Sequence, residues 1–249
     1  MTTISVVIPC FNDAGLLATC LAALAAQDRP ADEVIVVDNA STDATAATAR
    51  AAGARVVYEP VQGIWPAAAA GYDAATGDVI ARLDADSVPA PDWLARLESR
   101  LARSPEADLI TGTGDFYDSS PLVAWLGQTF YLGGYFFWVG LWLAHHPVFG
   151  SNFAMHRDVW LRARDRVHRE RSDIHDDLDL SMNLDPAVQV RYEHTLRVGV
   201  SGRPFATWSG FARRVRWGFR TLLQDWPEDT PWRRRAARRA ARHRLRVRT

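Results

Sequence analysis

The stretch SVVIP at Ser5–Pro9 places three β-branched aliphatic residues in succession. Such runs are typical of strands buried on both faces of a parallel sheet. Comparable runs predict three further strands: EVIVVD at Glu33–Asp38, RVVY at Arg55–Tyr58 and DVIARL at Asp78–Leu83. The segments between them favour helices: Ala14–Gln27, a segment capped by Ser41, Thr42 and Asp43 and ending near Ala52, and Ala67–Ala75. This alternation predicts an α/β fold with a mostly parallel sheet flanked by helices.

The composition is that of a globular protein with an unusual distribution of charge. The chain has 249 residues, 48% hydrophobic and 23% charged, which excludes wholesale disorder and allows one large domain or two small ones. The net charge is zero and there is no lysine, but residues 1–200 carry 15 arginines against 26 acids, and residues 201–249 carry 14 against 3. We therefore expect an acidic body and a basic C-terminal arm of the kind that meets phosphate groups.

The two cysteines, Cys10 and Cys20, lie in apolar contexts with no CxxC spacing and no histidines at ligand spacing. We interpret them as reduced core thiols of a cytosolic protein. No secretory signal is recognisable, because the first basic residue is Arg29 and the first apolar run has the pattern of a strand. We therefore expect a cytoplasmic location.

Polar segments follow the predicted strands, and in open α/β sheets ligands bind beyond the carboxyl ends of the strands. Four segments are candidates for such a site: Pro9–Asn12 (PCFN), Asp38–Asp43 (DNASTD), Asp84–Asp86 (DAD) and Asp176–Asp179 (DDLD). Neither a P-loop nor a GxGxxG motif follows the first strand, which argues against the usual ATPase and NAD-binding classes.

Asp84 and Asp86 come two residues apart after an apolar strand, so in an extended chain they project to the same side. Two such carboxylates repel each other unless a cation compensates them. A hard divalent ion with oxygen ligands can do so while keeping positions open for substrate phosphates. Arg82, on the same face, is the alternative as an ion-pair partner.

The acidic cluster at Asp173–Asp179 has two interpretations. Ile174, Leu178 and Met182 are spaced four apart, which predicts a helix with one buried stripe. Acidic residues at its start then serve as caps that favour the positive end of the helix dipole. The other interpretation is chemical, and it depends on the order of motifs along the whole chain.

Five segments occur in succession over roughly residues 4–204: SVVIPCFN, VVDNASTD, RLDAD, GSNFAMHR and DDLDL. In this order they resemble the family 2 glycosyltransferases. The resemblance implies the GT-A fold, a Rossmann-like arrangement of mostly parallel strands and helices. It also implies transfer of a sugar from a nucleotide-diphosphate donor with inversion at the anomeric carbon, and a divalent cofactor, Mg²⁺ or Mn²⁺.

The resemblance assigns the donor side to residues at the first, second and fourth strand ends. It implies that Pro9 and Asn12 line the nucleotide pocket and that Asp38 bonds the base or ribose. Asp84 and Asp86 match the Asp-x-Asp motif of the family, which places the ribose and the metal bound to the diphosphate. A divalent ion there stabilises the charge that gathers on the leaving group.

The Glu-Asp pair of the family falls on Asp176 and Asp177, which makes Asp177 the candidate general base. A carboxylate in that place takes the proton of an attacking hydroxyl. If the acceptor is an ionised lipid phosphate, Asp177 only orients it. Gly150 and Asn152, in GSNFAMHR, are further expected substrate-binding residues.

Three departures from the family pattern limit how far the residue roles of the family apply to this chain. Ala67–Ala69 stand where the family often has Ala-Arg-Asn, so one part of the donor pocket must be built differently. RRVRW at Arg213–Trp217 resembles the Gln-x-x-Arg-Trp motif of processive synthases with an arginine for the glutamine, and adds Arg216 and Trp217 as expected substrate-binding residues. The multi-span architecture of those synthases is missing, which favours single-sugar transfer. We interpret His194 as an ordinary strand-end histidine rather than as the late metal ligand of some GT-A enzymes.

Pro121–Ala144 is a stretch of 24 residues with no charge and eight aromatics. Its length is near the ~20 residues that span a bilayer as a helix. Gly133 and Gly134 at its middle, with the many aromatics, favour two shorter helices lying in or dipping into the bilayer surface. A true membrane span and a buried core or oligomer face are the alternatives.

Arg233–Arg248 contains nine arginines and no acid. It lacks the interleaved aromatics of single-strand binders, so we expect no nucleic-acid partner. Beside an apolar membrane candidate, anionic lipid is the simpler partner. A solvated tail is the alternative.

We therefore expect three parts: residues 1–115 as the nucleotide-sugar-binding half, 116–225 as the acceptor-binding half with a membrane-proximal segment at 121–149, and 226–249 as the Arg-rich arm. The expected function is inverting, metal-dependent transfer of one sugar to a hydroxyl, glycan or lipid-phosphate acceptor at the cytoplasmic membrane face. The alternatives are a catalytically inactive membrane scaffold of the same family and a sugar nucleotidyltransferase, whose Gly-rich basic loop is missing from PCFNDAG.

Overall fold

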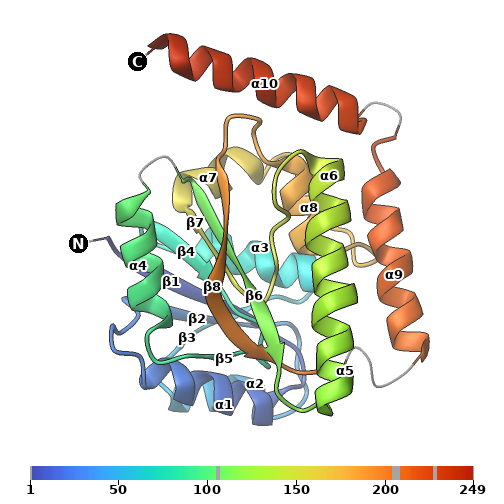
Figure 1. The fold of residues 1–249 in the computed structure, drawn as a ribbon. Coiled ribbons are helices and arrows are strands. Elements are labelled where there is room, and N and C mark those ends of the chain that lie inside the picture. The colour runs from blue at the N-terminus through green and yellow to red at the C-terminus, as the bar shows by residue number, and fades with distance from the viewer. Residues whose placement is uncertain (1, 105–106, 204–207, 227–228, 249) are drawn as a thin grey trace.

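One mixed β-sheet forms the centre of the molecule (Figure 1). The computed structural model describes residues 2–104, 107–203, 208–226 and 229–248, and within them the sheet has eight strands in the order β3-β2-β1-β4-β7-β6-β8-β5. The strands are β1 Ile4–Cys10, β2 Glu33–Asp38, β3 Arg55–Tyr58, β4 Val79–Arg82, β5 Val88–Pro89, β6 Leu109–Phe116, β7 Phe153–His156 and β8 Val190–Val200. Strands β1 to β4 are parallel, β7 runs antiparallel between β4 and β6, and β8 pairs parallel with β6 and antiparallel with β5. The predicted α/β class is confirmed.

Helices cover both faces of this sheet. Two buried clusters lie on its two sides: one packs α1 (Ala14–Ala25), α2 (Thr45–Ala51) and α4 (Trp93–Arg103) on Val6 and Ile8, and the other packs α3 (Ile64–Ala74), α7 (Arg157–Ala163) and α8 (Asp176–Asn183) on Val7. Successive residues of β1 therefore face opposite layers of helices, which is why its sequence is apolar without alternation. The predicted strands at Glu33–Asp38 and Arg55–Tyr58 have these bounds in the structure. The boundary expected at residue 115 lies inside β6, so the two expected halves share one sheet.

The apolar segment forms one continuous helix, not the two shorter helices expected from its glycines. It runs through α5 (Pro121–Leu126), two π-helical stretches (Gly127–Leu132 and Tyr135–Val139) and α6 (Gly140–Leu143). Gly133 and Gly134 keep right-handed helical backbone angles, so the pair does not break the helix. The helix ends at Ala144, which has a left-handed φ of 62°. Across the described part of the chain, no helix is both long and apolar enough to cross a membrane.

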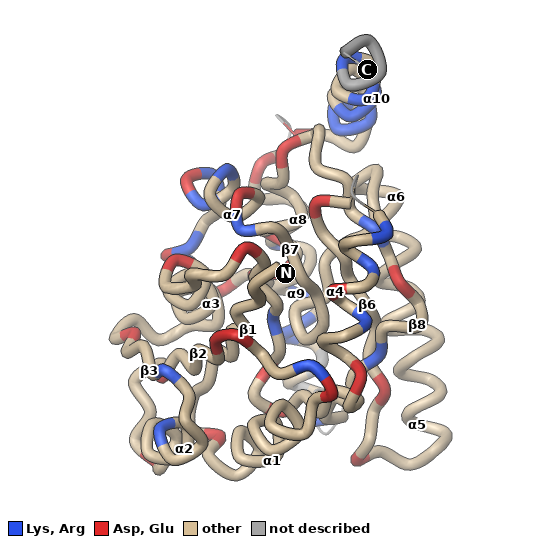
Figure 2. Tube along the Cα trace, turned by 90° about the vertical axis from the view of Figure 1, so that its left-hand side faces the viewer, with Lys and Arg blue, Asp and Glu red and all other residues tan. Residues whose placement is uncertain are grey.

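Two helices follow the last long strand and pack on the outside of the molecule (Figure 1). Helix α9 (Trp208–Leu223) contacts α8, and α10 (Pro231–Arg248) contacts α6. The basic residues gather along α10, as Figure 2 shows. Arg234 and Arg238 are nevertheless buried, and they donate to the carbonyls of Met182 and Val188. The arm is therefore a docked helix along its inner face rather than a freely solvated tail.

Candidate active site

The carboxyl ends of β1 and β2 meet in a hydrogen-bonded pair of loops. Asn12 has a left-handed φ of 51°, and its side-chain oxygen accepts from the backbone N–H of Thr42 at 2.7 Å and of Asp43 at 3.3 Å. Asp38 is 7% exposed and accepts from the Ser41 N–H at 3.0 Å, and its second oxygen has no partner among the described residues. Pro9 is buried within β1. The loops therefore hold Asp38 with one oxygen available to a ligand donor, whereas Asn12 braces the two loops.

Arg82 connects the end of β4 to the start of α8. It is 1% exposed, and its guanidinium donates to the Tyr72 hydroxyl at 2.9 Å, to Asp84 at 2.8 Å and to Asp176. Burying a guanidinium is costly unless carboxylates offset the lost hydration, and here two of them do so. The ion-pair alternative considered for Arg82 thus exists in the structure. It also joins the Asp-x-Asp segment to the acidic cluster, 94 residues away in sequence.

Asp84 and Asp86 differ in what surrounds them. The second oxygen of Asp84 accepts from the Ser151 hydroxyl at 2.6 Å, so both of its oxygens have protein partners. Asp86 instead pairs with Arg203 at 3.0 Å, and Arg203 also binds Asp13 through two contacts of 2.8 and 3.1 Å. Burial and the neighbouring Asp84 raise the pKa of Asp86, so its ionised form is short of positive charge despite this pair.

Arg203 is a site residue that the sequence analysis missed. It follows the carboxyl end of β8 just before residues 204–207, which lie outside the described residues. The signal that could have found it is its position after a strand, in the segment VGVSGR, where ligand-binding residues were already being sought.

Asp177 has the properties expected of a proton acceptor. It lies in the first turn of α8, half-buried, and its oxygens accept from the Gly150 N–H at 2.9 Å and the Leu178 N–H at 2.7 Å. Removal from water, and then the negative charge of Asp176, raise the pKa of Asp177 to about 6. Asp176 is itself buried and paired with Arg82. The pKa of Asp177 thus lies close to neutral pH, as a base working at physiological pH requires.

One part of the structural interpretation of the acidic cluster holds, the buried stripe; the N-cap residue of α8 is His175, with no side-chain cap hydrogen bond. Ile174, Leu178 and Met182 are all buried, as the four-residue spacing predicts. Asp179 is completely buried and accepts from the indole N–H of Trp65 at 2.7 Å and from the His168 backbone at 2.8 Å. Asp179 is therefore part of the core that fixes α8, and α8 in turn fixes Asp177.

The loop before β7 contributes the Gly150 backbone to the site, in addition to the Ser151 hydroxyl that binds Asp84. Gly150 is buried, and a Cβ added there would lie 3.2 Å from an oxygen of Asp177, so a larger residue would require the carboxylate to shift by a few tenths of an ångström. Asn152 is completely buried, and its amide donates to the carbonyls of Thr113 and Leu196 and accepts from Trp93. Both amide hydrogens are used inside the protein. The expectation that Asn152 binds substrate is therefore corrected: its side chain holds β6, β8 and α4 together.

Arg216 and Trp217 lie on α9, beside the start of α8. The Trp217 ring packs edge-on against His175 with centroids 6.1 Å apart, and the His175 ring bonds the Arg214 carbonyl at 2.8 Å. His175 immediately precedes Asp176, so this contact fixes α9 next to the candidate base. Arg216 is exposed on the same helix. The RRVRW segment is thus near the expected acceptor side, with Trp217 packed and Arg216 free to contact a ligand.

A divalent cation fits the site as a partly protein-bound ion. Among the described residues no cluster of three or more His, Cys, Asp or Glu side chains could hold a metal alone. His194 is 80% exposed, and its only ion-pairing carboxylate within the described chain is Glu193, in accord with an ordinary strand histidine. Asp84 and Asp86 supply carboxylate oxygens, which is the usual protein share where substrate phosphates and water complete the coordination of Mg²⁺. The raised pKa of Asp86 agrees with a carboxylate that lacks a full counter-charge.

The fold and these carboxylates, gathered at the strand ends and at the start of α8, define a glycosyltransferase of the GT-A class. The chain belongs to glycosyl transferase family 2, whose family model matches residues 5–162.

Curated relatives described as glycosyltransferases agree with this family membership. An uncharacterized glycosyltransferase of Mycobacterium tuberculosis is 44% identical over 109 residues, which cover 44% of this chain and 47% of the relative. Glycosyltransferase AglE of Haloferax volcanii is 33% identical over 121 residues, 45% of this chain and 40% of AglE. The matches thus span less than half the length of these curated relatives.

The fold is shared with solved structures of a mycobacterial enzyme. Glucosyl-3-phosphoglycerate synthase from Mycobacterium tuberculosis, in complex with Mn²⁺, uridine diphosphate and phosphoglyceric acid, aligns with a TM-score of 0.63 at 23% identity. The alignment covers 90% of this chain and 78% of the synthase. At this identity the likeness establishes the architecture, and the GT-A assignment made from the motifs is confirmed.

Proposed function

We propose that this protein transfers one sugar from a nucleotide-diphosphate sugar to an acceptor at the cytoplasmic face of the membrane, with inversion at the anomeric carbon. The observation that carries the proposal is the placement of Asp177. It is a half-buried carboxylate with a pKa raised to about 6, joined through Asp176 and Arg82 to the Asp84–Asp86 segment. One continuous charge network thus links the expected donor and acceptor sides.

The donor side is formed by the strand ends. Asp38 offers its free carboxylate oxygen to a ribose hydroxyl or a base N–H, and Pro9 and Asn12 shape the loops beside it. Asp84 and Asp86 face the diphosphate, and a divalent cation held by them supplies Lewis-acid stabilisation of the leaving diphosphate. Arg203 adds a guanidinium to the same place. Arginine suits this position because its planar donors match phosphate oxygens.

In the transfer step, the donor, the acceptor and Asp177 account for the bond formed, the bond broken and the proton removed. The acceptor oxygen attacks the anomeric carbon from the side opposite the diphosphate, and the bond from that carbon to the diphosphate oxygen breaks with its electron pair staying on the diphosphate. The acceptor proton passes to Asp177, whose raised pKa makes it a competent base. The Gly150 N–H keeps the carboxylate aimed during this step. With an ionised lipid phosphate as acceptor there is no proton to remove, and Asp177 has an orienting role only.

Membrane association is supported by the surface of the long helix. Eight large apolar side chains between residues 121 and 143 are exposed, among them Leu122 at 65%, Phe130 at 66% and Trp138 at 68%. Exposed apolar patches of this kind mark protein or membrane contacts. The arginines along α10, the helix that follows α9, supply electrostatic attraction to anionic lipid headgroups. A lipid-linked acceptor fits this arrangement best, and a soluble glycan acceptor is the second choice.

Nucleotide binding is the experiment that tests the proposal. Thermal shift and calorimetry with UDP, GDP and dTDP, each with and without Mn²⁺ or Mg²⁺, should show binding of one nucleotide that strengthens with the metal. Asp84→Asn should lower this binding. Asp158→Asn, an exposed pair with Arg162, is the matched control and should not. Absence of binding by all three nucleotides would contradict the proposal.

An inactive scaffold is the alternative that one observation favours. Ala67–Ala69 of α3 are buried in the core, so they offer no polar group to a donor where the family often has arginine and asparagine. A scaffold would bind vesicles but no nucleotide. An enzyme binds both, with Arg203 as the cation that makes up for the missing arginine.

A further inference from the structure

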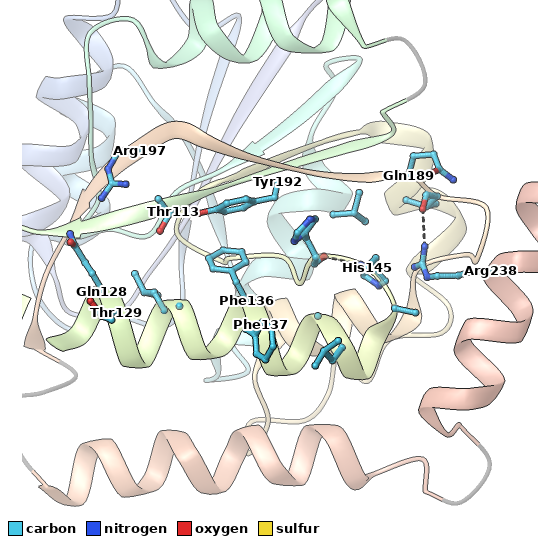
Figure 3. A pocket seen from close by; sticks show the side chains of 18 of the residues that line it. Thr113, Gln128, Thr129, Phe136, Phe137, His145, Gln189, Tyr192, Arg197 and Arg238 are labelled. Atoms are coloured by element: carbon cyan, nitrogen blue, oxygen red, sulfur yellow. Dashed lines mark hydrogen bonds between the residues drawn. The ribbon is translucent and has the colours of Figure 1, made fainter. Parts of the chain in front are cut away.

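A cavity of about 840 Å³ lies between the long helix, strands β6 and β8, and helix α10 (Figure 3). Its volume is in the range of small-molecule sites. Its lining is mixed: Leu132, Phe136 and Phe137 from the helix and Val190 and Tyr192 from β8 form an apolar and aromatic part, and polar side chains form the rest. The rings of Phe136 and Tyr192 pack at a tilt of 47° with their centroids 4.6 Å apart.

The cavity is separate from the proposed reaction site. On one face of the long helix, the Tyr135 hydroxyl donates to the Val148 carbonyl at 2.7 Å, on the segment that leads to Gly150 and Asp177. The next residue, Phe136, lies in the cavity wall. No residue of the donor or acceptor carboxylate network lines the cavity in the described part of the chain.

One end of the cavity carries positive charge without a negative partner. Arg238 is 8% exposed, and its only polar contact within the described part of the chain is to the Val188 carbonyl at 3.0 Å, drawn as a dashed line in Figure 3. No carboxylate in the described chain pairs with it. Arg242, one turn further along α10, lines the same cavity. Burial, with added repulsion from Arg234 and Arg242, lowers the pKa of Arg238 to about 10, so it stays charged at neutral pH.

The other end of the cavity has no excess of positive charge. Arg197, at the opposite end in Figure 3, is neutralised by Asp115, which also accepts from Gln128 at 2.6 Å. His145 lies near Arg238, and burial lowers its pKa to about 3, so it is neutral and adds no charge. A buried guanidinium without a counter-ion is unfavourable, whereas the same group binding an anion in an apolar site is strongly favoured.

We propose that this cavity binds a single-chain amphiphile with one anionic head group, its head on Arg238 and Arg242 and its apolar tail along Phe136, Phe137 and Tyr192. The positive charge of the arginines favours an anionic head group, and the aromatic and aliphatic side chains favour an apolar tail. A carboxylate and a phosphate monoester share the chemistry that the arginines recognise. The long helix, whose outer face is exposed and apolar, gives such a ligand a short route from a lipid surface.

Two variants test the site without disturbing the core. Arg242 is exposed, so Arg242→Gln removes one head-group contact and leaves the fold intact. A Cβ built at Gly133 has only the Gln128 carbonyl oxygen within 4 Å in the described structure, at 3.4 Å, so Gly133→Leu places its side chain into the cavity. Arg239→Gln, an exposed change on α10 outside the cavity lining, is the matched control.

The measurement is calorimetric titration of the full chain with dodecyl phosphate and dodecanoate below their micelle concentrations. Dodecanol and inorganic phosphate serve as probes of the tail and the head alone. We expect both anionic amphiphiles to bind, neither partial probe to bind comparably, Arg242→Gln to weaken binding about tenfold, and Gly133→Leu to abolish it. Arg239→Gln and Asp177→Asn should leave binding unchanged, which separates this site from the proposed reaction. Equal binding of dodecanol, or unchanged binding in both cavity variants, would overturn the proposal.

Discussion

Replacing Asp177 by asparagine tests the chemistry with the least disturbance of shape. Both carboxylate oxygens accept backbone N–H bonds, from Gly150 at 2.9 Å and Leu178 at 2.7 Å. An amide has one acceptor, so one of these bonds is lost, at a cost of about 1 kcal/mol. The change also removes the repulsion between Asp177 and Asp176, so we expect little net change in stability.

The catalytic effect should be far larger. A general base contributes about 10²–10⁴-fold, so kcat on a hydroxyl acceptor should fall by that factor while nucleotide affinity stays within about twofold. The pKa of about 6 predicts that wild-type kcat/KM declines as the pH falls below 6, since the base becomes protonated. Asp177→Asn should lack this acidic limb.

Asp177 also makes the free energy of unfolding depend on pH, and low pH favours stability although it lowers activity. Because the folded-state pKa lies above the ordinary value, Asp177 favours folding below about pH 4, and this contribution is lost as the pH rises through 6. Partial access to water limits the effect to about 1–2 kcal/mol. Denaturant titrations at pH 4 and 7 should therefore show a smaller pH dependence in Asp177→Asn than in wild type. If the variant keeps more than a third of wild-type kcat, or retains the acidic limb, the assignment of the base is wrong.

Three further predictions address the cation, the charge network and the membrane. Asp86→Asn should weaken Mn²⁺-dependent nucleotide binding more than tenfold in calorimetry, and full wild-type activity in excess EDTA would exclude the metal role. Arg82→Met should lower the free energy of unfolding by about 3–5 kcal/mol, measured with urea, because it leaves buried Asp176 without its cation; a loss below 1 kcal/mol would show that the pair is not needed. In flotation with anionic vesicles, Trp138→Ser should reduce binding at every salt concentration, whereas the exposed double change Arg239→Gln and Arg244→Gln should reduce it only at low salt, since the Debye length shortens to about 3 Å at 1 M; protein that stays unbound at low salt would refute the membrane proposal.

Local patterns were sufficient to predict the parallel half of the sheet. Strands buried on both faces are apolar at most positions, and such runs stand out in a sequence. The free cysteines, Cys10 and Cys20, are buried as expected. The start of α3 was placed too late, because Trp65 and Pro66 belong to the helix and Trp65 is anchored by Asp179, a contact 114 residues distant in sequence.

The site was predictable in composition but not in its connections. The order of motifs named the carboxylates as candidates, yet only the three-dimensional structure shows that Arg82 joins Asp84 to Asp176. The same holds for Arg203 beside Asp86 and for the burial of Asn152. The glycine pair in the long helix misled the prediction, because packing on β6 and α8 keeps glycine helical where an isolated helix would weaken.

The anomeric configuration of the product tests the central claim most directly. Proton NMR of the product formed from an α-linked nucleotide sugar, with the nucleotide selected by the binding screen, reports the configuration of the newly formed bond at the anomeric carbon. With a hydroxyl acceptor, the account predicts a β-configured product from the wild-type protein, formed at least a hundredfold more slowly by Asp177→Asn. An α-configured product, or turnover unaffected by that substitution, would contradict it.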